Sequence, residues 1–120
     1  MIKLIATDMD GTLLNEKGCL PEGFFEMLEK LKERNIKFVA ASGRPYKTLY
    51  ENFKPKSDYL DYICDNGSYV VLNDMKPVIN GLKKDVVHAV IKACEKIENT
   101  VVILCGVNGA YHMPCSDDYL

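Results

Sequence analysis

The sequence lacks an excess of one charge, a long apolar run and any pair of cysteines in C-x-x-C spacing. Fifteen basic and seventeen acidic residues give a net charge of −2, and no run of like charges is long enough to bind a nucleic-acid backbone or a membrane surface. The apolar segment 2–6 is too short for a membrane span or a signal-peptide core. These absences predict a cytoplasmic protein whose partner is neither nucleic acid nor membrane.

The composition is typical of a globular protein. Hydrophobic residues make up 48% of the 120 residues, charged residues make up 27%, and there are only five prolines, which excludes a disordered chain. A chain of this length can bury enough surface for one domain, whereas two complete domains would be cramped. The five cysteines are odd in number and mostly lie in apolar stretches, so we interpret them as reduced, structural residues.

The first part of the chain has the pattern of a strand, a helix and a second strand. Residues 2–7 form a nearly continuous apolar run, which is typical of a strand buried on both faces of a parallel sheet. Pro21 can occupy the first position of a helix whose apolar residues recur at helical spacing through Leu31. A second apolar run at 36–41 completes a βαβ unit, in which both strands are parallel and end at the same edge of the sheet.

The pattern changes after this unit. Pro45 begins a second predicted helix that ends near Phe53, and residues 62–65 form a third predicted strand. Two hairpins and one more helix are expected downstream, which indicates that an antiparallel subdomain begins near residue 80. The predicted segments are the hairpin 68–72 with 77–79, a helix capped by Asp85, and the hairpin 101–107 with 110–113 around Asn108-Gly109.

Two aspartates follow the first predicted strand. Asp8 and Asp10 lie two residues apart, so their side chains emerge on one face at the carboxyl edge, where open α/β sheets bind ligands. Two carboxylates this close cannot both ionise freely, so either a divalent cation neutralises them or one of them keeps a proton. Both possibilities suit phosphoryl transfer, with Mg²⁺ as the cation that oxygen ligands favour. Gly11 allows a close turn and Thr12 adds a hydroxyl; the alternative explanation is a polar turn that the aspartates cap.

The second predicted strand ends in Ser42-Gly43-Arg44-Pro45, directly before the second predicted helix. Backbone N–H groups, a serine hydroxyl and a guanidinium at this place would bind phosphate oxygens. The alternative is that Ser42 only caps the helix while Arg44 is solvated at the helix start. Both segments follow parallel strands of one βαβ unit, so we expect the aspartate pair and the anion site to face one cleft.

Three segments carry recognisable motifs, namely IKLIATDMDGTLL, FVAASGRP and ICDNGSYV. In residues, order and spacing they resemble the first motif, the second motif and the N-G segment of the haloacid dehalogenase superfamily, specifically of its Cof-type phosphatases. The resemblance implies an α/β fold in which residues 1–80 form part of a Rossmann-like core with a parallel sheet. Residues 81–120 would be the beginning of an α/β cap domain with antiparallel strands.

The resemblance also implies an activity, which is the Mg²⁺-dependent hydrolysis of phosphate esters through an aspartyl-phosphate. Asp8 would be the nucleophile, and Asp10 would be the general acid and base. The Asp8 carboxylate and the backbone carbonyl of Asp10 would bind Mg²⁺. The substrate would be a small phosphorylated metabolite, often a sugar phosphate. The residues that the resemblance places on the substrate side are Thr12, Ser42, Gly43, Arg44 and Asn66.

Parts of the family pattern are missing from this sequence. No lysine can be assigned to the third motif, and the acidic cluster of the fourth motif, G-D-x-x-x-D, does not occur. We therefore interpret the chain as the N-terminal part of a longer protein or as a truncated form, and expect weak Mg²⁺ binding and slow or no turnover from it alone. Two other functions stay open, which are an inactive phosphate-binding or regulatory module and a phosphotransferase. Exposed edges of an incomplete sheet would favour self-association.

Overall fold

The computed structural model describes residues 1–112 of the chain. The chain divides into two compact units, which are residues 1–80 and the residues from 81 onward, and each unit is described by itself. None of the helices in the described part of the chain is long and apolar enough to span a membrane. The first unit contains all the residues that the sequence assigns to a catalytic or binding role.

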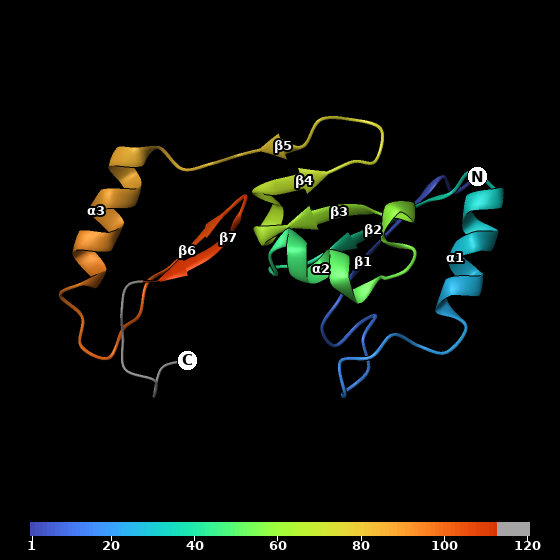
Figure 1. The fold of residues 1–120 in the computed structure, drawn as a ribbon, viewed down its shortest axis with the longest axis horizontal. Helices are drawn as coiled ribbons and strands as arrows, with labels where there is room; N and C mark the ends of the chain where they lie inside the picture. Colours follow the sequence, from blue (N-terminus) through green and yellow to red (C-terminus); the bar gives the residue numbers. More distant parts are fainter. Residues whose placement is uncertain (113–120) are drawn as a thin grey trace. The chain divides into compact units, whose positions relative to one another are not determined.

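A five-stranded mixed sheet forms the first unit (Figure 1). The strands follow one another in the order β1-β2-β3-β4-β5, with β2 parallel to both β1 and β3, and with β4 antiparallel to both β3 and β5. Their bounds are Leu4–Asp8, Lys37–Ala41, Asp61–Cys64, Tyr69–Val71 and Val78–Ile79. The predicted α/β class and the βαβ unit are confirmed.

Two α-helices and two short 3-10 helices connect the strands, namely α1 (Phe24–Glu33), α2 (Tyr46–Asn52), η1 (Ser57–Tyr59) and η2 (Asp65–Gly67). The prediction that Pro21 begins the first helix is wrong. Gly23 has a φ of 75°, a left-handed conformation that interrupts a right-handed helix, so α1 begins only at the next residue. At α2, Pro45 keeps an extended backbone with a ψ of 148° and occupies the cap position.

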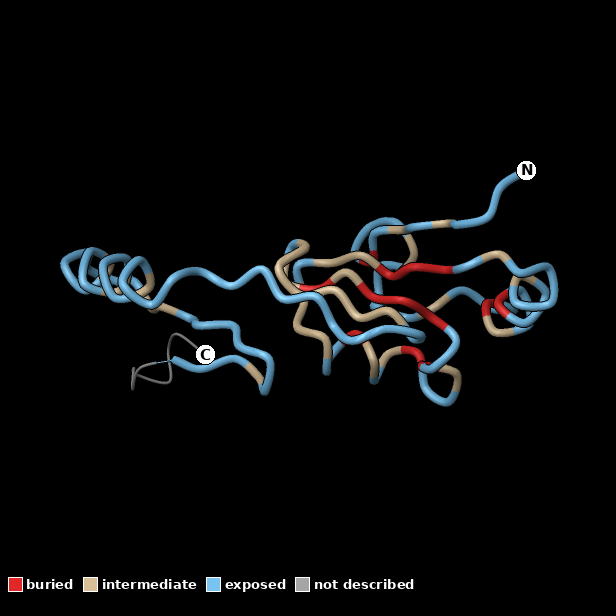
Figure 2. Tube along the Cα trace, turned by 90° about the horizontal axis from the view of Figure 1, so that it is seen from above, coloured by how far each residue is buried: buried red, intermediate tan, exposed pale blue. Residues whose placement is uncertain are grey.

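The core of the first unit is built on the central strands. Buried residues concentrate on β2, β3 and the helical segments that pack against them, whereas β1 and β5 at the sheet edges are largely exposed (Figure 2). Phe24 of α1 packs edge-on against Phe38 of β2, with 5.4 Å between ring centroids. Phe53, at the end of α2, lies 6.0 Å from the ring of Tyr62 in β3. Each of these buried rings contributes about 1.5–3 kcal/mol of apolar burial, which holds both helices on the sheet.

The expectation that the first strand is buried on both faces is wrong. Leu4 is 53% exposed, and Ala6 and Asp8 are exposed as well. Among residues 1–112, β1 pairs with β2 alone and lies at an edge of the sheet, so in this part of the chain the alternate residues Ile5 and Thr7 are partly covered. A continuous apolar run therefore identified the strand but not its position in the sheet.

The second unit contains the helix α3 (Lys84–Cys94). The prediction that Asp85 caps this helix is wrong, because the cap position is Lys83. Asp85 lies instead in the first turn of α3, where a negative charge still interacts favourably with the helix dipole. No described residue of this unit is fully buried.

An antiparallel pair of strands follows α3, with bounds Ile103–Gly106 for β6 and Gly109–His112 for β7. Gly106 pairs with Gly109, so the turn of this hairpin consists of residues 107–108. The predicted hairpin is present, and its turn lies one residue before the predicted Asn-Gly pair. The predicted strand residue 113 lies outside the described residues.

Candidate active site

The carboxyl ends of β1 and β2 meet at one edge of the sheet. Asp8, the last residue of β1, is the register partner of Ala41, the last residue of β2, so Ser42 begins the next segment beside Asp8. Ser42 donates its backbone N–H to the carbonyl of Ile63 in β3 at 2.9 Å. Parallel pairing therefore places the ends of three strands together, at the edge where sheets of this kind bind ligands.

A tight turn after β1 presents the two aspartates. Met9 lies between them and is fully buried, and its carbonyl accepts the backbone N–H groups of residues 12–14 at 2.8–3.4 Å. Gly11 has a φ of 74°, the left-handed conformation that glycine adopts without strain. Asp8 and Asp10 are both exposed. The buried Met9 side chain thus anchors the turn, while both aspartates reach solvent.

The guanidinium of Arg44 binds the Asp10 carboxylate across the sheet edge. Arg44 Nε donates to Asp10 Oδ2 at 3.0 Å, and Arg44 Nη2 donates to Asp10 Oδ1 at 2.5 Å, so the ion pair is bidentate. The Arg44 and Asp10 side chains are 36% and 58% exposed, which limits the stabilisation from the pair to about 1 kcal/mol. The sequence analysis gave two ways to reduce the repulsion between the two carboxylates, which are a bound cation and a retained proton. The structure adds a third, which is the ion pair with Arg44.

Ser42 does not cap α2. The cap position is Pro45, and no side-chain hydrogen bond caps this helix. Instead, Ser42 Oγ accepts the backbone N–H of Arg44 at 3.2 Å, which closes the turn after β2. A hydroxyl that accepts here can still donate its own proton to an anion, so Ser42 keeps the chemistry of a phosphate-binding residue.

Asn66 reaches the same turn from the end of β3. Its backbone N–H donates to the Ser42 carbonyl at 3.3 Å, and its Oδ1 atom would lie 3.0 Å from a Cβ atom added at Gly43. Asn66 has a φ of 54°, a left-handed conformation that asparagine tolerates better than most residues. The predicted site residues that the structure brings together are Asp8, Asp10, Ser42, Gly43, Arg44 and Asn66, and Thr12 is exposed on the turn that follows Asp10.

The sequence reasoning missed Asp65. This residue donates its backbone N–H to the Arg44 carbonyl at 3.2 Å, and its φ is 48°. Its Oδ1 atom is buried and has no hydrogen-bond partner among the described residues. The signal that could have found it is the Asp-Asn-Gly sequence at 65–67, because these three residue types favour left-handed turns and such turns often position functional loops.

The aspartate turn offers oxygen ligands for a cation. The Asp8 carboxylate is exposed, whereas both carboxylate oxygens of Asp10 bind Arg44, which leaves Asp10 its backbone carbonyl. Proteins commonly hold Mg²⁺ through one or two carboxylates, while water and substrate phosphate complete the coordination. No group of three or more acidic, histidine or cysteine side chains within residues 1–112 could hold a metal ion. The Asp8 carboxylate and the Asp10 carbonyl therefore fit Mg²⁺ as two of the several ligands that this ion needs.

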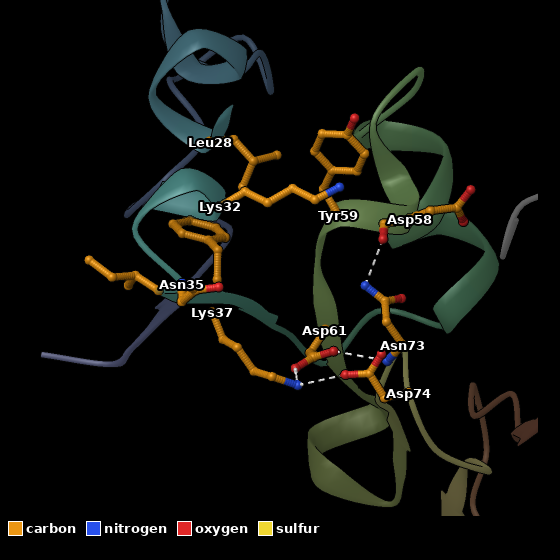
Figure 3. A pocket seen from close by; sticks show the side chains of 11 residues that line it. Leu28, Lys32, Asn35, Lys37, Asp58, Tyr59, Asp61, Asn73 and Asp74 are labelled. Atoms are coloured by element: carbon orange, nitrogen blue, oxygen red, sulfur yellow. Dashed lines mark hydrogen bonds and ion pairs between the residues drawn. The ribbon is translucent and has the colours of Figure 1, made fainter. Parts of the chain in front are cut away.

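A separate cleft lies at the opposite, amino-terminal end of β2 and β3 (Figure 3) and has a volume of about 400 Å³. Two lysines reach across it. Lys37 Nζ lies 3.4 Å from an oxygen of Asp61 and 3.4 Å from an oxygen of Asp74, and the Asp61 carboxylate raises the pKa of Lys37 above its ordinary value. Lys32 Nζ lies 3.5 Å from the centre of the Tyr59 ring. None of the predicted site residues lines this cleft.

A sequence profile of the haloacid dehalogenase-like hydrolase family matches residues 5–118. The chain belongs to this family. The match covers nearly the whole sequence and includes the aspartate turn, the Ser42-Gly43-Arg44 segment and Asn66. The resemblance to Cof-type phosphatases of this family is confirmed.

Named relatives of the family include phosphatases. The chain is 37% identical over 119 residues to the 5-amino-6-(5-phospho-D-ribitylamino)uracil phosphatase YbjI of Escherichia coli, which covers 98% of this chain and 44% of that protein. It is 31% identical over 87 residues to the pyridoxal phosphate phosphatase YbhA of the same species, which covers 72% of this chain and 32% of that protein. The crystal structure of SMU.1108c from Streptococcus mutans aligns with a TM-score of 0.82 at 32% identity, covering 98% of this chain and 46% of the other. The chain thus spans less than half the length of these relatives.

Proposed function

We propose that this chain carries the nucleophile and the phosphate-binding turn of a Mg²⁺-dependent phosphatase, which acts on small phosphorylated metabolites through an aspartyl-phosphate. The observation that supports this most is the register between β1 and β2. It sets the exposed Asp8 beside Ser42, while Arg44 on the same turn binds Asp10. A nucleophilic carboxylate, a second carboxylate and an anion-binding turn therefore share one sheet edge.

The proposed reaction has two steps. In the first, a carboxylate oxygen of Asp8 attacks phosphorus, the bond from phosphorus to the ester oxygen breaks, and Asp10 gives a proton to the leaving alcohol. In the second, Asp10 takes a proton from water, the water oxygen attacks phosphorus, and Asp8 is released with inorganic phosphate. Ser42 Oγ–H donates to a phosphoryl oxygen in both steps. When bound by the Asp8 carboxylate and the Asp10 carbonyl, Mg²⁺ would supply positive charge that offsets the charge on the phosphoryl oxygens.

The relatives suggest the substrate class. YbjI and YbhA are named for phosphate esters of two small metabolites, so we propose substrates of this size, sugar phosphates among them, in the cytoplasm. Residues 1–80 would form part of the core domain, and the residues from 81 onward would begin a cap domain that selects the substrate. The complete protein, with roughly twice this length, is the proposed active form, and its third and fourth motifs would lie in the remainder.

The experiment is turnover of p-nitrophenyl phosphate by the complete protein with Mg²⁺. Replacing the nucleophile, Asp8→Asn, should lower kcat at least about 10³-fold, as loss of a nucleophile does in other enzymes that form covalent intermediates. Glu16→Gln removes an exposed carboxylate from the loop that follows the aspartate turn and should leave kcat unchanged. Unchanged turnover in Asp8→Asn refutes the assignment. Product analysis with an added alcohol acceptor distinguishes hydrolysis from phosphotransfer.

An inactive phosphate-binding module gives a different result in a trapping experiment. Beryllofluoride with Mg²⁺ mimics a phosphoryl group on an aspartate, so a competent site in the complete protein should bind it stoichiometrically through Asp8. A module that only binds phosphate should not form this adduct. In the competent site, Asp8→Asn should prevent it.

A further inference from the structure

The Arg44–Asp10 ion pair joins the two segments on which the proposed phosphatase depends. We propose that Arg44 is a positioning residue with two alternative partners. In the free protein it holds the carboxylate of Asp10; when a phosphate ester arrives, its guanidinium exchanges that carboxylate for phosphoryl oxygens and releases Asp10 toward the leaving group. This inference rests on the proposed function, because it assigns the order of events at the same site.

Hydrogen bonds hold the backbone on both sides of the pair, so the exchange is proposed for the side chains. The Arg44 N–H donates to Ser42 Oγ at 3.2 Å, and the Arg44 carbonyl accepts the Asp65 N–H at 3.2 Å. The turn that carries Asp10 is held by the carbonyl of the buried Met9. The proposed movement of the guanidinium is therefore a rotation of the Arg44 side chain that leaves both turns in place.

The chemistry and exposure of the ion pair favour exchange of the Asp10 carboxylate for a phosphate group. The fork of N–H donors in arginine fits a carboxylate and a phosphate group equally well in geometry, and a phosphate dianion carries the greater charge. The Arg44 side chain is 36% exposed and the Asp10 side chain is 58% exposed, so solvent reaches the pair and can replace either partner. Ser42 and Arg44 belong to one turn, in which the Arg44 backbone N–H donates to Ser42 Oγ at 3.2 Å, so a phosphoryl group at the Ser42 hydroxyl would lie beside the residue that carries the guanidinium.

The hydrogen bonds of Asp10 explain why it must be released before it can act. In the free protein both of its carboxylate oxygens accept from Arg44, Oδ1 at 2.5 Å and Oδ2 at 3.0 Å. An oxygen held in this way is occupied by the guanidinium. Binding of the phosphate group would therefore release the Asp10 carboxylate, which takes a proton from solvent and then gives it to the leaving alcohol, only when a phosphoryl group is present. This deepens the proposed function by making the acid dependent on the substrate.

The test is binding of inorganic phosphate to the complete protein, measured by calorimetry in three backgrounds: wild type, Asp10→Asn and Asp8→Asn. Arg44→Gln is introduced into each. If Asp10 occupies Arg44 in the free protein, Arg44→Gln should weaken phosphate binding about tenfold in the Asp10→Asn background, where the guanidinium is free, but only about twofold in wild type. Asp8→Asn is the matched control because it removes a neighbouring charge without touching the pair, so the effect there should stay near twofold.

A second readout follows the guanidinium directly. The NMR signal of Arg44 Nε–Hε should shift when phosphate is added to the complete wild-type protein, and it should already be shifted in Asp10→Asn without phosphate. Arg44→Lys keeps the positive charge but loses the two parallel N–H donors of the guanidinium. Its phosphate affinity should therefore be similar in the wild-type and Asp10→Asn backgrounds. Equal effects of Arg44→Gln in all three backgrounds, or an Arg44 signal that phosphate leaves unmoved, would overturn the exchange. Turnover that survives Asp8→Asn in the complete protein would instead refute the proposed function alone.

Discussion

Replacing Gly43 by alanine probes how closely two loops of the site pack. A Cβ atom at Gly43 would lie 3.0 Å from Asn66 Oδ1, 3.4 Å from Asn66 Nδ2 and 3.5 Å from Asn66 Cγ. The φ of Gly43 is outside the left-handed region, so alanine brings no backbone strain and only the steric contact remains. The Asn66 side chain must give way by a few tenths of an ångström. Overpacking of this kind costs about 1–3 kcal/mol, and the low end applies because the Asn66 side chain is exposed and can rotate.

Urea unfolding measures this cost. With a urea dependence of about 1.5 kcal/mol per molar, a loss of about 1 kcal/mol lowers the unfolding midpoint of Gly43→Ala by about 0.7 M. In an Asn66→Gly background the obstructing side chain is absent, so Gly43→Ala should cost less than about 0.3 kcal/mol. An equal loss of stability in both backgrounds would show that the cost does not arise from the contact with Asn66.

Two further predictions follow from pKa shifts. Burial raises the pKa of the Cys64 thiol to about 12, so iodoacetamide at pH 8 should alkylate the exposed Cys19 and leave Cys64 unlabelled in the folded chain, as checked by mass spectrometry; comparable labelling of both would contradict this. The Asp61 carboxylate, with Asp74, raises the pKa of Lys37, so the stabilisation from Lys37 is fully present below pH 10.5 and is lost as the pH rises through the folded-state value. The stability difference between wild type and Lys37→Gln should therefore shrink in strongly alkaline buffer and in high salt, and a difference that stays constant from pH 8 to pH 11.5 would contradict the assignment.

The part of the site that lies at the ends of strands could be predicted from the sequence. The apolar runs at 2–7 and 36–41 identify two strands, and the single helix between them requires the strands to be parallel. Parallel strands end at the same edge, so the sequence predicts that Asp8 and Ser42 lie at one edge of the sheet. The same logic extends to Asn66 only through the family motif, because a turn after the third strand has no periodic signal of its own.

The side-chain pairing within the site could not be predicted in this way. Arg44 was expected to face a phosphate group, and in the structure it binds Asp10, which is 34 positions earlier in the chain. The spacing between two residues in sequence says nothing about which of several neighbouring charges a long, flexible arginine will select. That choice depends on the distances between strand ends and on the turns that orient them.

The sequence by itself determined the family, the α/β class and the edge of the sheet at which the polar motifs gather, because hydrophobic periodicity and motif order are properties of short segments. Only the tertiary structure decided that β1 lies at a sheet edge among residues 1–112, that Gly23 delays the first helix, and that Arg44 neutralises Asp10. The physical reason is that burial and ion pairing depend on which segments lie side by side, and residues distant in the sequence meet only after the chain has folded.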